Sequence, residues 1–192
     1  DLSGYMVGYA DFANGTKLQT LKLGDRGTGY SNTNLIELYL GNNTLLKTID
    51  VRNCPNLGIG ANEEGTVQSD VDISGCSNIE HIYFDGTSIK ALTLPNGGVI
   101  KTLHLPGTIT NLTIRNQKQI TDFVLPNYSN ITTLRLENVS NAVPMATILA
   151  AIPTNSRVRL IGFDWSFNSV ADILSFCDRL DTMRGLDENG NN

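Results

Sequence analysis

The side chains with the most reactive chemistry in this sequence are two histidines and three cysteines. Cys54 and Cys76 hold matching positions in VRNCPNL and ISGCSNI, 22 residues apart, with no histidine near them at zinc-ligand spacing. We expect both to be stacked core residues rather than a disulfide or metal pair, because three cysteines do not make a disulfide framework. Cys177 is expected in a core on a helix rather than as a nucleophile. His81 and His104 are expected as surface residues in different rows of neighbouring coils, with a metal pair as the alternative.

Carboxylates and glycines offer weaker signals. Asp70 and Asp72 in SDVDIS carry oxygens that calcium accepts, but they have neither EF-hand nor G-G-x-G-x-D spacing, which favours solvated carboxylates on a strand. The segment ANEEGT at 61–66 is typical of a solvated turn. The segment GDRGTG at 24–29 lacks both the Walker lysine and the Rossmann spacing. The sequence therefore predicts no catalytic residue, no cofactor and no metal site.

The elements that position these residues come from a short repeat. A phrase of the form apolar-x-x-apolar-x-apolar recurs about every 11 residues through most of the chain. Its copies are Leu18–Leu23, Leu35–Leu40, Leu46–Val51, the degenerate Gln68–Ile73, Ile79–Phe84, Ile89–Leu94, Ile100–Leu105, Ile109–Ile114, Ile120–Leu125 and Ile131–Leu136.

Geometry decides how many phrases make one coil. A strand advances about 3.3 Å per residue and facing sheets lie about 10 Å apart, so 11 residues leave only two or three for each face. Two phrases leave about eight residues per face, which fits a phrase of six. We therefore predict a mostly β solenoid with coils of about 20–28 residues and parallel strands on two sides. Thr93 and Thr113 should share one side and His104 should lie on the other.

The C-terminal end of the chain sets the phase of the predicted coils. We expect a short helix over 145–152, a strand over 157–163, and an amphipathic helix from SVADILSFCDRLDTM with Ser169 as its cap. The apolar face of that helix, which includes Ile173, Leu174, Cys177 and Leu180, should cover the last coil. Counting backward gives primary strands at 21–23, 49–51, 71–73, 92–94, 112–114, 134–136 and 158–160. The phrases that begin at 35, 79, 100 and 120 form the opposite side.

Three copies extend to a longer pattern, L-x-x-L-x-L-x-x-N/C-x-x-L. They are LIELYLGNNTLL, LKTIDVRNCPNL and QSDVDISGCSNI, with Asn43, Cys54 and Cys76 in the polar position. This pattern resembles the leucine-rich repeat family, in which the polar side chain satisfies backbone groups in the turn. The resemblance implies a leucine-rich-repeat-type solenoid over 18–165, an N-terminal cap or linker over 1–17, and a C-terminal α/β cap with helix and tail over 166–192.

Longer segments are similar to leucine-rich-repeat regions of tail-associated structural proteins from tailed phages and prophages of Gram-positive bacteria. They include LQTLKLGDRGTGY, VDISGCSNIEHIYFDGTSI and LPNGGVIKTLHLPGTITNLTIRNQ. The resemblance implies a non-enzymatic structural and interaction module of a phage tail, located in the virion or otherwise outside the cell. Its partners would be other tail proteins or a host-surface protein or carbohydrate. A bacterial cell-surface adhesin is the alternative, followed by an accessory domain of a wall-glycan hydrolase.

Composition narrows the classes of partner. The net charge of −5 without a basic cluster disfavours nucleic acid. There is no apolar run of about 20 residues, so the sequence predicts no membrane partner. The start at Asp1 and the end in DENGNN suggest a fragment of a longer polypeptide. The sequence does not indicate an oligomeric state.

The remaining candidate is a row of outward residues between the inner apolar residues of the primary strands. It would be acidic near one end and basic near the other, which suits a ligand-facing surface, although a solvated sheet face has the same polarity. The predicted interaction stripe consists of Lys22, Asp50, Asp72, Thr93, Thr113, Arg135 and Arg159. The opposite side should present Tyr39, Tyr83, His104 and Val124.

Overall fold

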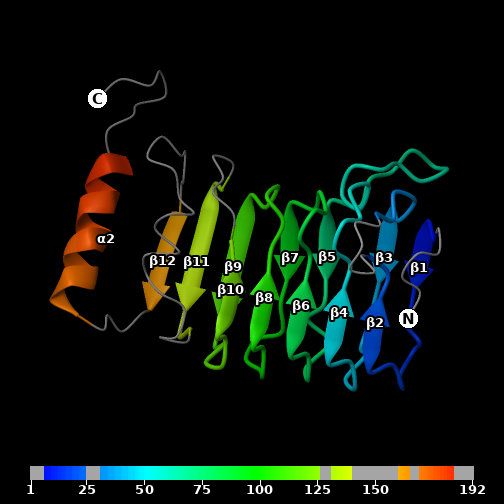
Figure 1. The fold of residues 1–192 in the computed structure, drawn as a ribbon, viewed down its shortest axis with the longest axis horizontal. Helices are drawn as coiled ribbons and strands as arrows, with labels where there is room; N and C mark the ends of the chain where they lie inside the picture. The colour runs from blue at the N-terminus through cyan, green and yellow to red at the C-terminus, as the bar shows by residue number, and fades with distance from the viewer. Residues whose placement is uncertain (1–6, 25–30, 126–130, 140–159, 165–168, 184–192) are drawn as a thin grey trace.

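A computed structural model describes residues 7–24, 31–125, 131–139, 160–164 and 169–183 of the 192-residue chain. Short parallel strands lie on two facing sides, and all but the last described strand alternate between these sides, so the described chain forms a β-solenoid-like stack (Figure 1). We call the two sides face one and face two. Face one carries β1 (Tyr9–Asp11), β3 (Glu37–Tyr39), β5 (Asp70–Asp72), β7 (Ala91–Thr93), β9 (Asn111–Arg115), β11 (Thr133–Glu137) and β12 (Leu160–Asp164). Face two carries β2 (Thr20–Lys22), β4 (Thr48–Asp50), β6 (His81–Tyr83), β8 (Thr102–His104) and β10 (Asp122–Val124).

The inner apolar residues of the repeat hold the two faces together. Ile82 in β6 pairs in register with Leu103 in β8, and Leu103 with Phe123 in β10, so one coil takes about 20 residues. The inner residues of both faces belong to one buried cluster that runs along the stack. Burying a side chain such as Ile82 stabilises the fold by about 1.5–3 kcal/mol. The mostly β fold with parallel strands on two sides is therefore confirmed.

Thr93 and Thr113 lie on face one and His104 on face two, as predicted. β7 precedes β8 and β9 follows it along the chain, so the two threonine strands belong to consecutive coils. The phrase that recurs about every 11 residues in the sequence thus corresponds to half a coil.

Polar side chains in the turns satisfy carbonyl groups at the ends of strands. Asn43 Nδ2 donates to the Phe12 carbonyl over 2.7 Å, and Thr87 Oγ1 donates to the Phe84 carbonyl over 2.9 Å. Gln117 Nε2 donates to the Pro95 carbonyl in the turn after β7. All three side chains are buried, where an unpaired carbonyl would be costly. The polar position of the repeat pattern that is occupied by Asn43 therefore does lie inside a turn.

The segment between β4 and β5 corrects the predicted phase. Ile49 and Val71 are 22 residues apart, and this spacing predicted one full coil on one face. In the structure Ile49 lies on face two and Val71 on face one, because residues 54–69 form a long corner loop within a half coil. The loop is closed by Asn62, whose backbone N–H donates to the Thr66 carbonyl.

The two buried cysteines lie at opposite corners of the stack. Cys54 follows β4 on face two and Cys76 follows β5 on face one. The prediction that the two cysteines stack on each other is therefore wrong. Both are free thiols in the core, which confirms their core role. Burial raises the pKa of Cys54 to about 12 and also raises the pKa of Cys76.

The predicted C-terminal amphipathic helix is α2 (Val170–Met183), and the Ser169 carbonyl accepts a hydrogen bond from the Ile173 N–H. The helix stands apart from β12 (Figure 1), and Ile173, Leu174 and Cys177 are exposed. The prediction that Cys177 is a core residue is therefore wrong. The covering of the last coil by this helix stays a prediction, and the helix expected over 145–152 lies outside the described residues. The described part of the chain holds no helix with the length and apolarity that a membrane crossing requires.

Candidate functional site

The predicted interaction stripe is divided between the two faces. Asp72, Thr93, Thr113 and Arg135 lie on face one, on the strands β5, β7, β9 and β11. In that sheet Asp72 is paired in register with Thr93 and Thr113 with Arg135. These four residues form a row that is acidic at its N-terminal end and basic at its C-terminal end.

The other three members of the stripe were placed wrongly or lie outside the described residues. Lys22 and Asp50 are paired with each other on face two, because the predicted phase fails at the loop 54–69. Arg159 lies outside the described residues. β12 pairs with β11 so that Gly162, three positions later, lies opposite Arg135. The prediction that Tyr39 shares a face with Tyr83 is wrong for the same reason as for Asp50, because β3 belongs to face one.

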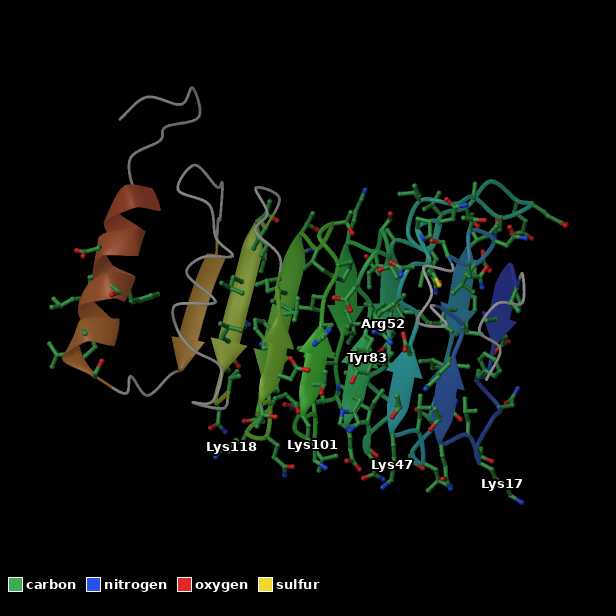
Figure 2. The ribbon with its side chains drawn as sticks, in the orientation of Figure 1. Lys17, Lys47, Arg52, Tyr83, Lys101 and Lys118 are labelled. Atoms are coloured by element: carbon green, nitrogen blue, oxygen red, sulfur yellow. The ribbon has the colours of Figure 1, made fainter. Side chains whose placement is uncertain are left out.

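The outer side of face two is closed by contacts among its own side chains. Asp50 is 4% exposed and is covered by Arg52, whose Nε and Nη2 lie 2.9 and 2.6 Å from its two carboxylate oxygens. The Arg52 guanidinium lies 4.9 Å from the centre of the Tyr83 ring, a cation–π contact (Figure 2). Asp50 is therefore engaged within the fold rather than presented to a ligand.

The two histidines of face two are also engaged. His104 lies with Nδ1 3.3 Å from Asp85 Oδ2 and Nε2 3.1 Å from Asp122 Oδ2, although neither contact has hydrogen-bond alignment. His81 Nδ1 lies 3.1 Å from Thr102 Oγ1. The prediction that the histidines occupy neighbouring coils in different rows is confirmed, since β6 pairs with β8 and each histidine is paired with a different residue. Within the described ranges, no three His, Cys, Asp or Glu side chains cluster in a way that could hold a metal ion.

A row of lysines follows one long edge of the stack, beside the turns that lead into the strands of face two. Lys17, Lys47, Lys101 and Lys118 project along this edge in Figure 2. Glu80 lies between two of them, with its carboxylate oxygens 3.2 Å from Lys47 Nζ and 2.6 Å from Lys101 Nζ. These hydrogen bonds lower the pKa of the Glu80 carboxyl. Glu80 thus contacts two of the four lysines and offsets one positive charge, which weakens the row as a surface for polyanions.

Face one is interrupted between β3 and β5, and a side chain takes over the sheet contact there. Gln68 Nε2 donates to the Leu38 carbonyl over 2.9 Å, while its Oε1 accepts from the Leu38 N–H over 2.7 Å. The carboxamide therefore replaces a peptide group of a neighbouring strand, since it offers the same donor and acceptor. Without paired backbones, the two strands leave a hollow of about 410 Å³ between them.

Exposed polar and aromatic groups surround this hollow. Tyr39 forms one wall, and Asp70, Asp72 and Gln68 form the other. Tyr39 is 41% exposed, and both aspartates are exposed. One oxygen of Asp72 accepts the Ser74 N–H over 2.8 Å. Among the described residues, no lysine, arginine or histidine nitrogen lies within 4.0 Å of the Asp70 or Asp72 carboxylates. Their charges are therefore presented to solvent.

A second hollow lies at the N-terminal end of face one. It measures about 460 Å³ and is lined by Tyr9, Glu37 and the loop residues 62–64. The rings of Tyr9 and Tyr39 are 5.7 Å apart and tilted by 44°. Partial burial is the largest cause that raises the pKa of Tyr39, and the nearby carboxylate of Glu37 is the second. Both phenols therefore stay protonated at neutral pH as hydrogen-bond donors and aromatic surfaces.

The C-terminal half of face one has a different character. β7 and β9 pair only at Ala91 and Asn111, and a hollow of about 350 Å³ lies farther along, beside Thr93 and Thr113. Arg115, which also lines it, is 2.8 Å from the Glu137 carboxylate. Arg135 is 3.2 Å from the same carboxylate, so both basic groups are offset in part.

Sequence reasoning missed two components of the site, Tyr39 and Gln68. Tyr39 was assigned to the wrong face. Gln68 appeared only as a degenerate phrase, although a polar residue at an apolar position was a signal that the local packing changes there. Comparison of the chain with family models, with curated proteins and with solved structures gave no match.

Proposed function

We propose that this chain is a non-enzymatic structural and interaction module, a leucine-rich-repeat-type solenoid that belongs to a phage tail or tail-fibre protein. Face one is its recognition surface, for a host-surface molecule or for another tail protein. The observation that carries this proposal is the contrast between the faces. Asp50, Arg52 and Tyr83 on face two engage one another, whereas Tyr39, Asp70 and Asp72 in the N-terminal half of face one surround a hollow and are exposed.

The repeat type is supported by the turns. Buried side chains such as Asn43 and Thr87 bond the carbonyls at strand ends, which is what the polar position does in leucine-rich repeats. A solenoid of this kind presents a long surface of fixed spacing, because each coil contacts only its neighbours along the stack. A C-terminal cap formed by α2 belongs to the same proposal.

A non-enzymatic role is supported by the placement of the carboxylates. Glycoside hydrolysis needs two carboxyl groups facing each other across the scissile bond. Asp50 and Asp72 lie on opposite faces, and Asp70 and Asp72 lie in one strand, on the same side of the hollow.

Binding to cells tests the proposal. Fluorescently labelled protein is incubated with a panel of Gram-positive bacteria, and with walls stripped of protein or of carbohydrate. We expect saturable binding to some strains, which a Tyr39→Ala and Asp72→Asn double variant loses and a face-two Asp122→Asn control keeps. Binding that is equal for the double variant and the control would refute face one as the surface. Release of soluble sugar from the walls would refute the non-enzymatic role.

A further inference from the structure

The hollow between β3 and β5 has the chemistry of a saccharide site. We propose that it binds a hydroxyl-rich saccharide without anionic groups, with a sugar ring on Tyr39 and its hydroxyl or amino donors on Asp70 and Asp72. This inference rests on the proposed function and names the class of ligand that face one recognises.

The ring surface comes from Tyr39. Its side chain is partly exposed at the rim of the hollow and lies beside the exposed Tyr9, whose ring centre is 5.7 Å away. An aromatic ring fixed by a neighbour loses little freedom when a ligand covers it, and it offers the apolar face of a sugar a flat partner.

The donors of the ligand are matched by acceptors of the protein. One oxygen of Asp72 accepts a hydrogen bond from the Ser74 N–H, and one oxygen of Asp70 accepts a hydrogen bond from the Ser69 hydroxyl over 3.2 Å. The second oxygen of each carboxylate has lone pairs directed away from these contacts. An ionised carboxylate accepts strong hydrogen bonds from hydroxyl or ammonium groups. A ligand rich in donors therefore fits this wall of the hollow.

Charge selects among saccharides. The N-terminal half of face one carries Asp11, Glu37, Asp70 and Asp72, none of which forms an ion pair with a described residue. Like charges within a Debye length of about 8–10 Å repel an incoming anion at physiological salt. Neutral and amino sugars are accepted on this basis, and uronic acids or phosphate-bearing polymers are disfavoured.

An extended peptide is the less favoured occupant. A peptide that added a strand to β3 would need the N–H and carbonyl of Leu38, and the Gln68 carboxamide occupies both of them. The hollow also provides one aromatic wall rather than a row of apolar pockets for alternate side chains.

Calorimetry with three defined hexasaccharides tests the inference. The probes are hexamers of N-acetylglucosamine, of glucosamine and of galacturonic acid, titrated into the whole chain. We expect the first or second to bind and the third not to bind. Tyr39→Ala and Asp72→Asn should each weaken binding by about tenfold, the loss of one good contact. Thr93→Ala on the next strand, and Asp122→Asn on face two, serve as controls that should keep wild-type affinity. Circular dichroism and melting confirm that each variant is folded.

The results distinguish failure of the saccharide inference from failure of the proposed function. Preferential binding of the anionic hexamer, or equal binding by the Asp72 and Thr93 variants, would overturn the inference while leaving the proposed function standing. Binding to cells that is lost from protease-treated walls but kept on deglycosylated walls would identify a protein partner and would also overturn it. Absence of binding to any cell and to any probe would overturn both proposals together.

Discussion

Replacing Gln68 by alanine should detach β3 from β5. The carboxamide makes two hydrogen bonds to Leu38, one to its N–H and one to its carbonyl. Each such bond contributes about 0.5–1.5 kcal/mol to stability, so the variant should lose about 1–3 kcal/mol in the free energy of unfolding. For a chain of this length, a loss of about 2 kcal/mol lowers the melting temperature by about 4–8 °C. Gln68→Glu should be no better, because a carboxylate cannot donate to the Leu38 carbonyl.

Two measurements test whether the Gln68 carboxamide joins the two strands. Urea or thermal unfolding followed by circular dichroism gives the global loss, and hydrogen exchange of the Leu38 amide reports the local bond. Gln19→Ala is the matched control, because Gln19 is exposed and its replacement should change stability by less than about 0.5 kcal/mol. If Gln68→Ala melts like the Gln19 variant and the Leu38 amide stays protected, the carboxamide does not join the strands and the reasoning fails.

Three further predictions follow from the core, the lysine edge and the turns. In folded protein at pH 8, a disulfide reagent should modify Cys177 at once and the buried cysteines only after unfolding, because burial raises the pKa of Cys54 to about 12; rapid modification of a second thiol, or protection of Cys177, would contradict this. Because the pKa of Glu80 is lowered in the folded state, Glu80 contributes stability above its unfolded pKa of about 4.3, and this contribution is lost as the pH falls through the lower folded value. Glu80→Gln should therefore be less stable than wild type at pH 7 and equal to it near about pH 2 in urea unfolding; a difference that persists at low pH would refute the ion-pair origin. Gly58→Ala should cost roughly 3 kcal/mol, since Gly58 has φ +110° and an added Cβ would lie 2.3 Å from backbone, whereas Gly65→Ala, with φ +76° and open space, should cost only about 1 kcal/mol; equal melting temperatures would contradict this.

The repeat made the fold predictable because every inner apolar residue faces the same requirement. Ile49, Val71, Ile82 and Leu103 are all buried, each at the position that the phrase assigns to it. Burial of the phrase depends only on its own alternation, so it survives irregularity elsewhere in the chain.

Assignment of strands to faces was less predictable, because it depends on what happens between phrases. The distance from Ile49 to Val71 equals one coil in residue number, although it is half a coil in space. A long corner loop and a complete coil are the same length, and the apolar pattern does not separate them. The site was therefore only partly predictable: Asp72 was found, Tyr39 was placed on the wrong face, and Asp50 was hidden by Arg52, two residues away in sequence.

The alternation of strands between two faces from β1 to β11 constrains how such a chain can change in length during evolution. Gain or loss of a single phrase would transfer every later strand to the opposite side, so that Thr93 and Thr113 would exchange sides with His104. Gain or loss of a complete coil, as between Leu92 and Leu112, would only lengthen or shorten the stack. Natural length variants should therefore differ by pairs of phrases, or within corner loops such as 54–69, where added residues leave the downstream strands on their original side.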